Sequence, residues 1–328
     1  MIRVGRSAAK TDPGRRRRGN EDAYVCKPPL FAIADGMGGA QAGEVASALA
    51  ADALRELTEG ARVTDLIREA NRRVHDRAST DASTSGMGTT ITAAIVERDG
   101  TITFGHVGDS RAYLLRDDRL EQITNDHSLV AELVRRGELS PAEAEVHPQR
   151  SVITRALGTD PDIDVDSFAV EPKPGDLYLI CSDGLSDMVD GGDIEVILRT
   201  HRGNLDEAAR ALIQAANRAG GEDNITAVLF ETVDGDEPDE TTREYHEPAA
   251  ITSTFKDTDT LHPEDHVQPP PPAPAADDTM VVPAAQLTAE EEVEEEFEAG
   301  LGRRMLALAV IIALSVLIVV LVWWGLAR

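Results

Sequence analysis

The stretch Phe31-Ala-Ile-Ala-Asp-Gly-Met-Gly-Gly39 joins a short apolar run to one aspartate and a group of glycines. Two later stretches, Leu177-Tyr-Leu-Ile-Cys-Ser-Asp-Gly184 and Gly220-Gly-Glu-Asp-Asn-Ile225, also place one aspartate beside an apolar run. Each predicts a buried strand whose end delivers a carboxylate, because glycine permits the tight backbone turn at such a junction. We expect the aspartates of these stretches to converge in the folded protein: Asp35, Asp183 and Asp223.

Carboxylates that gather without histidine or cysteine favour a hard divalent cation such as Mg²⁺ or Mn²⁺ over zinc. An oxygen-rich metal site of this kind is compatible with a nuclease, a kinase-like transferase or a phosphatase. The three aspartates therefore predict a metal centre but do not by themselves select its reaction.

Composition divides the chain of 328 residues near Val233, which predicts one folded domain over residues 1–233. The whole chain has only six Phe, four Tyr and two Trp, so the core has to be built mainly from Ala, Val, Leu and Ile. Two cysteines, Cys26 and Cys181, are too few for a disulfide framework and indicate a reducing compartment.

The formal charge of −27 is concentrated in one region of the chain. Residues 234–298 contain 20 Asp and Glu against only Arg243 and Lys256, a local charge of −18 that is two thirds of the total. The remainder is moderately acidic, which argues against nucleic acid as a partner because a phosphate backbone requires a basic surface. The acidic, Pro- and Thr-rich residues 234–302 are expected to form a disordered linker.

Residues 303–328 are expected to form one transmembrane helix with a short tail. Met305 to Trp324 is a run of 20 residues without a charge, long enough to cross a hydrocarbon core of about 30 Å. Arg303 and Arg304 precede it, so the positive-inside rule places the large N-terminal domain in the cytoplasm. No N-terminal signal is visible, and we expect a single-pass protein of the cell membrane, a cytoplasmic enzyme or module anchored by its last helix.

Hydrophobic periodicity predicts an α+β layered domain, because strands come in runs and helices in pairs. Helices are expected over residues 43–57, 63–78, 127–136, 141–146, 194–198 and 205–218. Strands are expected over residues 89–96, 102–107, 112–115, 165–170, 176–181 and 225–231, with a hairpin turn at Asp99-Gly100.

Six short motifs follow one another in a fixed order along the chain. They are Arg17 with Arg18-Gly-Asn-Glu-Asp22, Asp35-Gly-Met-Gly-Gly39, Gly88-Thr-Thr90, His106-Val-Gly-Asp-Ser-Arg111, Ser182-Asp-Gly-Leu185 and Glu222-Asp-Asn224. In this order they resemble the motifs of the metal-dependent protein phosphatase 2C family, in its bacterial Ser/Thr phosphatase branch, over residues 5 to 231. The resemblance implies a central β-sandwich flanked by pairs of antiparallel helices, with a binuclear Mg²⁺ or Mn²⁺ centre at one end.

The resemblance also implies roles for individual residues at this centre. Asp35 resembles the carboxylate that bridges both metals, and the Gly36 carbonyl resembles a ligand of one of them. Asp183 and Asp223 resemble the carboxylates that hold the other metal. Asp22, with Glu21 beside it, resembles the acid that binds a metal-held water.

Further positions of the family pattern concern the phosphate and a third metal. Arg17 resembles the phosphate-binding arginine. Asp109 resembles the ligand of a weaker third metal shared with Asp183, and Ser151 is expected to touch that ion through a mobile flap over residues 127–155. Met37 stands where animal relatives carry a histidine, so the general acid is not identified, and a metal-bound water is the candidate.

The resemblance implies hydrolysis of phosphoserine and phosphothreonine by a metal-activated water, without a covalent phosphoenzyme. His106 is interpreted as a structural residue, because hard cations prefer oxygen ligands. Asp126 and Asp187 are interpreted as solvated surface acids.

Three functional hypotheses follow. The first is a membrane-tethered phosphatase that opposes Ser/Thr protein kinases and their substrates. The second is a pseudophosphatase that serves as a docking platform, which the complete set of acids disfavours. The third restricts the substrates to phosphorylated anti-sigma-antagonist proteins, whose phosphatases usually carry a sensor domain before the catalytic domain.

Overall fold

Two antiparallel sheets form the centre of the structure, a computed structural model that describes residues 2–56, 60–235 and 280–281. The first sheet has the strand order β1-β12-β11-β7-β8, and the second has the order β10-β6-β5-β3-β2 with β4 paired to β3. The strands of the first sheet are β1 (Ile2–Asp12), β12 (Ile225–Asp234), β11 (Leu177–Cys181), β7 (Arg111–Arg116) and β8 (Arg119–Gln122). Those of the second are β10 (Asp166–Val170), β6 (Ile102–Val107), β5 (Ile91–Val96), β3 (Leu30–Met37), β2 (Asp22–Lys27) and β4 (Gly88–Thr89).

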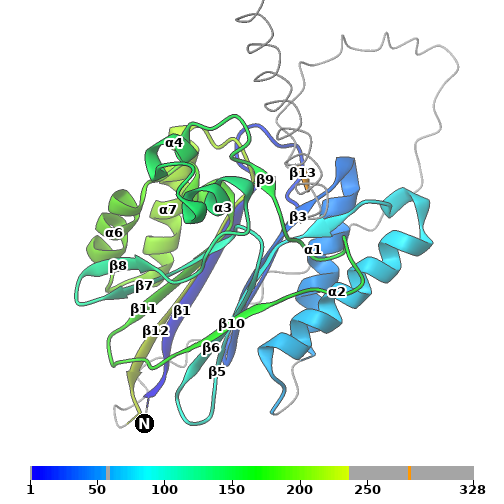
Figure 1. The fold of residues 1–328 in the computed structure, drawn as a ribbon. Coiled ribbons are helices and arrows are strands. Elements are labelled where there is room, and N and C mark those ends of the chain that lie inside the picture. The colour runs from blue at the N-terminus through cyan, green and yellow to red at the C-terminus, as the bar shows by residue number, and fades with distance from the viewer. Residues whose placement is uncertain (1, 57–59, 236–279, 282–328) are drawn as a thin grey trace, which may run out of the picture. The chain divides into compact units, whose positions relative to one another are not determined.

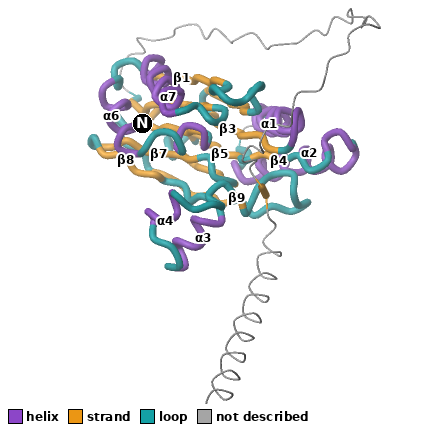
Figure 2. Tube along the Cα trace, turned by 90° about the horizontal axis from the view of Figure 1, so that it is seen from above, coloured by secondary structure: helices purple, strands orange, loops and turns teal. Residues whose placement is uncertain are grey.

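Helices cover the outer faces of both sheets (Figure 1). The pair α1 (Gly39–Arg55) and α2 (Val63–Thr80) packs on the second sheet, whereas α6 (Gly191–Thr200) and α7 (Leu205–Ala219) pack on the first. A separate segment between the sheets' ends carries α3 (Leu129–Arg136), α4 (Pro141–Glu145) and β9 (Val152–Ile153), and it projects from the sandwich in Figure 2. The remaining elements are α5 (Asp183–Ser186), a 3₁₀ turn (Ala82–Thr84) and β13 (Met280–Val281).

Strict alternation along the strands builds three separate apolar layers. In β3, Phe31 and Ile33 point into the space between the sheets, while Ala32 and Ala34 pack against α1 and α2. The same alternation in β11 and β12 fills the inter-sheet layer with aromatic rings, and Phe31 and Phe230 stack with centroids 4.1 Å apart. Most aromatic residues of the described ranges thus lie between the sheets, and the predicted α+β sandwich with helix pairs is confirmed.

Several element boundaries differ from those expected from the sequence. Strand β3 continues through Asp35 to Met37, so this aspartate lies inside a strand and not after its end. The helix expected from residue 127 begins at Leu129, because Ser128 is its N-cap and accepts a hydrogen bond from the Ala131 amide. Strands β1, β2 and β8 were not predicted: β1 and β8 are rich in polar residues and largely half-exposed or exposed, and the apolar run of β2 is only four residues long and mostly half-exposed.

Within the described residues, no helix has the length and apolar character needed to cross a membrane. The predicted linker, residues 234–302, lies outside the described part of the chain except for residues 234–235 and 280–281, and the predicted span Met305–Trp324 lies wholly outside it. The boundary at residue 233 and the membrane span therefore stay predictions.

Candidate metal centre and phosphate site

Asp22 and Asp35 face each other across two paired strands. Asp22 is the first residue of β2, and it is the direct antiparallel partner of Asp35 in β3. Like charges directly opposite each other destabilise a sheet, so this pairing is costly for folding and indicates a site. Burial is the main cause that raises the pKa of Asp35, and the charges of Asp22 and Asp183 raise it further, so Asp35 lies near both carboxylates.

Asp183 and Asp223 reach the same region from the other sheet. Asp183 is the first residue of α5 directly after β11, and Asp223 precedes β12, which is the neighbour of β11. A Cβ on Gly184 would lie 2.1 Å from the Asn224 carbonyl oxygen, so only glycine allows the two segments to approach this closely. The structure thus brings Asp183 and Asp223 beside Asp35, and each of the two raises the pKa of Asp35.

Burial and mutual repulsion shift the acids of this cluster. Desolvation, the larger cause, and nearby carboxylates raise the pKa of Asp22 to about 6 and hold those of Asp35 and Asp183 well above their usual range. Asp109, in the turn between β6 and β7, has its pKa raised to about 7 by burial and then by the charges of Asp126 and Asp187. Such shifts in one cluster are typical of functional sites.

Three carboxylate oxygens in this region are buried without a hydrogen-bond partner: Asp22 Oδ1, Asp109 Oδ1 and Asp183 Oδ1. Buried polar atoms are normally paired, so these oxygens fit a positively charged ligand. Among the described ranges, no three or more His, Cys, Asp or Glu side chains form a ready-made metal cage. The donor set contains oxygen alone, and its chemistry fits Mg²⁺ or Mn²⁺.

Two hydroxyl groups orient Asp22, and sequence reasoning did not identify either of them. Ser182 Oγ donates to Asp22 Oδ2 at 3.0 Å, and Thr226 Oγ1 donates to the same oxygen. Ser182 belongs to the motif that contains Asp183, and Thr226 lies two residues after Asn224, so their motif positions were the available signal. Their bonds leave Asp22 Oδ1 directed toward the cluster without a partner.

Gly36 lies where the backbone of three segments meets. A Cβ at this position would lie 2.1 Å from the Gly43 carbonyl oxygen and 2.6 Å from the Glu21 carbonyl oxygen. The Gly36 amide donates to Glu21 at 3.2 Å, which fixes the residue next to Asp22. The requirement for glycine at this position is therefore steric.

Arg17 reaches the carboxylate cluster from the N-terminal loop. Its Nη2 atom is 2.9 Å from Asp223 Oδ2. Asn224 holds the loop in place, because its side-chain amide donates to the Pro13 and Gly19 carbonyls and its Oδ1 accepts from the Glu21 amide. In the sequence Asn224 stands out only as part of a motif. The structure shows that it connects residues 13–21 to the segment before β12.

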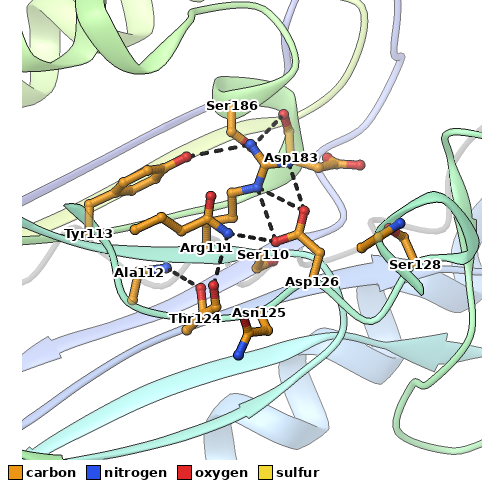
Figure 3. A network of polar contacts seen from close by, with 12 residues as sticks. Ser110, Arg111, Ala112, Tyr113, Thr124, Asn125, Asp126, Ser128, Asp183 and Ser186 are labelled. Atoms are coloured by element: carbon orange, nitrogen blue, oxygen red, sulfur yellow. Dashed lines mark hydrogen bonds and ion pairs between the residues drawn. The ribbon is translucent and has the colours of Figure 1, made fainter. Parts of the chain in front are cut away.

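A partly buried ion pair joins Arg111 to Asp126 (Figure 3). The Arg111 guanidinium binds Asp126 through two nitrogens, with Nη2 to Oδ2 at 2.7 Å, and its other side faces Tyr113. Asp126 is only 11% exposed in its side chain, so its interpretation as a solvated surface acid was wrong. The terminal arginine of the Gly-Asp-Ser-Arg motif thus has a carboxylate partner in the fold.

His106 is structural, as expected. It is fully buried, its Nδ1 lies 2.9 Å from Thr92 Oγ1, and its Nε2 lies 3.0 Å from the Asn125 carbonyl oxygen. Burial lowers the pKa of His106 to about 3, so the ring is neutral. Ser151 lies in the segment before β9, and no hydrogen bond or ion pair of the described residues joins it to Asp109 or Asp183.

Comparisons with known proteins agree with this geometry. The model of the protein phosphatase 2C family matches residues 19–135. The serine/threonine phosphatase stp of Listeria monocytogenes serovar 1/2a is 42% identical over 238 residues, which cover 68% of this chain and 94% of that protein. The serine/threonine protein phosphatase PstP of Mycobacterium tuberculosis is 42% identical over 240 residues, which cover 71% of this chain and 46% of that protein.

Solved structures show the same fold. The crystal structure of the Mycobacterium tuberculosis phosphatase PstP/Ppp has a TM-score of 0.66 and 40% identity, covering 70% of this chain and 98% of that chain. The PstP catalytic domain in complex with two manganese ions has a TM-score of 0.65 and 38% identity, covering 71% of this chain and all of that chain. The fold and the site thus define a metal-dependent protein Ser/Thr phosphatase, and the chain belongs to the protein phosphatase 2C family. Within that family it falls in the bacterial branch that contains Stp and PstP.

Proposed function

We propose that the clustered aspartates of this phosphatase hold two Mn²⁺ or Mg²⁺ ions, with Asp35 between them. In this assignment Asp183 and Asp223 bind one ion, and Asp22 and the Gly36 carbonyl serve the other. The observation that carries the proposal is the set of three buried carboxylate oxygens without partners, on Asp22, Asp109 and Asp183, with Asp35 directly opposite Asp22 in the sheet. The pair of manganese ions in the PstP catalytic domain supports it.

Bound divalent cations supply Lewis-acid activation of water and neutralise charge on the phosphoryl group. The protein's own side chains position the substrate and the acids. Arg17 offers a planar, permanently charged group for the phosphoryl oxygens, and its present partner Asp223 holds it at the edge of the cluster. Ser182 and Thr226 fix the orientation of Asp22.

Met37 is buried and has no proton to donate, so we assign protonation of the departing serine or threonine oxygen to water. Asp109 has a buried oxygen without a partner, and its charge raises the pKa of Asp183. We assign Asp109 to a weaker third ion shared with Asp183, with Ser151 as its contact from the segment that carries α3 and α4.

The test is a metal-dependence assay on the full chain. Matched peptides carrying phosphoserine, phosphothreonine or phosphotyrosine are incubated with Mn²⁺, with Mg²⁺ and with EDTA. Hydrolysis of the first two that requires a divalent ion supports the proposal. Turnover that persists in EDTA after extensive dialysis rules out the metal assignment.

We further propose that the enzyme acts at the inner face of the cell membrane on phosphorylated proteins that include Ser/Thr protein kinases. The uncharged run Met305 to Trp324, preceded by Arg303 and Arg304, supports a single-pass anchor with a cytoplasmic catalytic domain. A tether raises the effective concentration of a membrane-bound substrate when its length matches the span. Recovery of the full chain in the soluble fraction of lysed cells would contradict this location.

The substrate assignment needs a separate comparison. The rates on a phosphorylated kinase activation-loop peptide and on a phosphorylated anti-sigma-antagonist protein are measured with the same enzyme. A preference for the kinase peptide supports the proposal, and a strong preference for the antagonist protein overturns it.

A further inference from the structure

An open groove of about 670 Å³ lies between the end of β1, the loop after it and helix α7. Arg210 and Arg218 lie eight residues apart on α7, so both project from the same side of the helix. Lys10 is exposed near the end of β1, and Arg15 lies in the loop that follows this strand. The lining thus contains four cationic side chains: Lys10, Arg15, Arg210 and Arg218.

The groove contains one acid, and that acid is already engaged. Asp12 Oδ1 accepts hydrogen bonds from the Gly14 amide at 2.9 Å and from Asn217 Nδ2 at 3.1 Å. These bonds connect the loop to α7, so Asp12 shapes the groove. It forms no ion pair with any of the groove's cations.

Most of the groove's cations also lack a partner elsewhere. Within residues 2–56 and 60–235, no ion pair involves Lys10, Arg15 or Arg218, while Arg210 pairs only with the exposed Glu207. The chain as a whole carries a charge of −27. Exposed cations gathered in one groove of an acidic protein repel one another and attract an anionic ligand.

The loop that lines the groove is hydrogen-bonded to the segment that carries Asp223. The amides of Arg15 and Arg16 donate to the Gly221 carbonyl at 2.7 and 3.3 Å, next to the loop that carries Asp223. Arg17, two residues after Arg15, is the partner of Asp223. A peptide whose phosphate lies at Arg17 can therefore place its neighbouring residues in the groove.

A second connection runs through side chains. Thr11, in the groove, shares a hydrogen bond of 2.7 Å with Thr226 Oγ1. Thr226 in turn donates to Asp22 of the carboxylate cluster. The groove and the cluster are thus linked through the paired ends of β1 and β12.

We propose that this groove binds an acidic segment of the phosphoprotein substrate, adjacent to the residue that is dephosphorylated. The inference rests on the proposed phosphatase site, because it assigns the groove to the same substrate. A protein ligand is favoured over nucleic acid because the four cations form one short groove beside the phosphate site of a protein phosphatase, and the surrounding chain is acidic.

The test compares two phosphothreonine peptides with the full chain and Mn²⁺. One peptide has a run of alanines on both sides of the phosphothreonine, and the other has glutamates in the same positions. The variants are the double substitution K10A/R218A and the charge reversal R218E. Arg119→Ala is the matched control, because Arg119 is an exposed arginine on β8 outside the groove.

The wild type is expected to have a higher kcat/KM for the glutamate peptide than for the alanine peptide. The difference should come from a lower KM for the glutamate peptide. Exposed charge pairs contribute about 0.2–1 kcal/mol each, so K10A/R218A, which removes two of them, should reduce this preference by roughly two- to thirtyfold. R218E should reduce it further, and R119A should leave it unchanged. In 1 M salt, where the screening length is about 3 Å, the wild-type preference should disappear.

Hydrolysis of p-nitrophenyl phosphate by each variant separates the two proposals. If the wild type hydrolyses neither this ester nor the alanine peptide, the metal-site proposal fails. If both are hydrolysed but the preference is absent, or is unchanged in K10A/R218A, the groove inference is overturned. It is also overturned if the double variant loses affinity for a labelled oligodeoxynucleotide while it keeps the peptide preference.

Discussion

Replacing Asp22 by asparagine should stabilise the metal-free protein at neutral pH. Burial is the main reason that the pKa of Asp22 is raised from 3.8 to about 6. The amide oxygen of the introduced side chain can keep the hydrogen bonds from Ser182 and Thr226, and its NH₂ group replaces the buried oxygen that lacks a partner. The substitution thus removes a buried negative charge without removing its supports.

The expected gain follows from the pKa difference. A raised pKa means that the folded state binds the proton more tightly, so the stability from this group is complete below pH 3.8 and is lost as the pH rises to 6. The pKa shift of roughly 2 units, at 1.36 kcal/mol per unit, predicts that Asp22→Asn raises the free energy of unfolding by about 3 kcal/mol at pH 7. At pH 4 the same calculation gives less than about 1 kcal/mol.

The assay is urea unfolding of metal-free protein, followed by circular dichroism between pH 4 and 8. Asp22→Asn should be more stable than the wild type at pH 7, and the difference should shrink toward pH 4. Asp99→Asn is the control: Asp99 is exposed, and a hydrogen bond from the Thr101 amide lowers its pKa, so its substitution should bring no gain as the pH rises. Equal or lower stability of Asp22→Asn at pH 7, or a difference independent of pH, would refute the reasoning.

Three further substitutions test other parts of the site. Asp183→Asn should reduce kcat more than tenfold, and activity above a tenth of wild type would count against the assignment of Asp183. The metal-free protein should stay at least as stable, because the substitution relieves repulsion from Asp109 and Asp223. Arg17→Ala should mainly raise KM for phosphopeptides, roughly tenfold, and unchanged kinetics would remove Arg17 from the site. Asp126→Ala should cost about 3 kcal/mol in urea unfolding, since it leaves the half-buried Arg111 cation unpaired, and a loss below about 1 kcal/mol would contradict this.

The sequence predicted the layered fold because continuous apolar runs mark the central strands. In β3, β11 and β12 both faces are buried, so nearly every residue is apolar and the strands are visible as continuous runs. The strand β1 could not be found this way. Ten of its eleven residues are partly or fully exposed, and its place in the sheet depends on pairing with β12 at the other end of the domain.

The candidate site was predictable at the residues that carry negative charge and unpredictable at the residues that support them. Asp35, Asp183 and Asp223 each follow or precede an apolar run, and that pattern is local. Ser182 and Thr226 act through hydrogen bonds to Asp22, more than 150 residues away in the sequence, which no local pattern specifies.

The structure also explains why local reasoning misjudged Asp126. An aspartate next to an exposed asparagine, in a loop, has the composition of a solvated turn. Its burial is imposed by Arg111, whose guanidinium has to be neutralised because it lies between the sheet and the turn that carries Asp183. Burial and nearby acids raise the pKa of Asp109, and the positive charge of Arg111 opposes that rise. Without Asp126 the guanidinium would lose the carboxylate that binds two of its nitrogens, and a half-buried positive charge would stay without a partner, which is the physical origin of the predicted loss of stability.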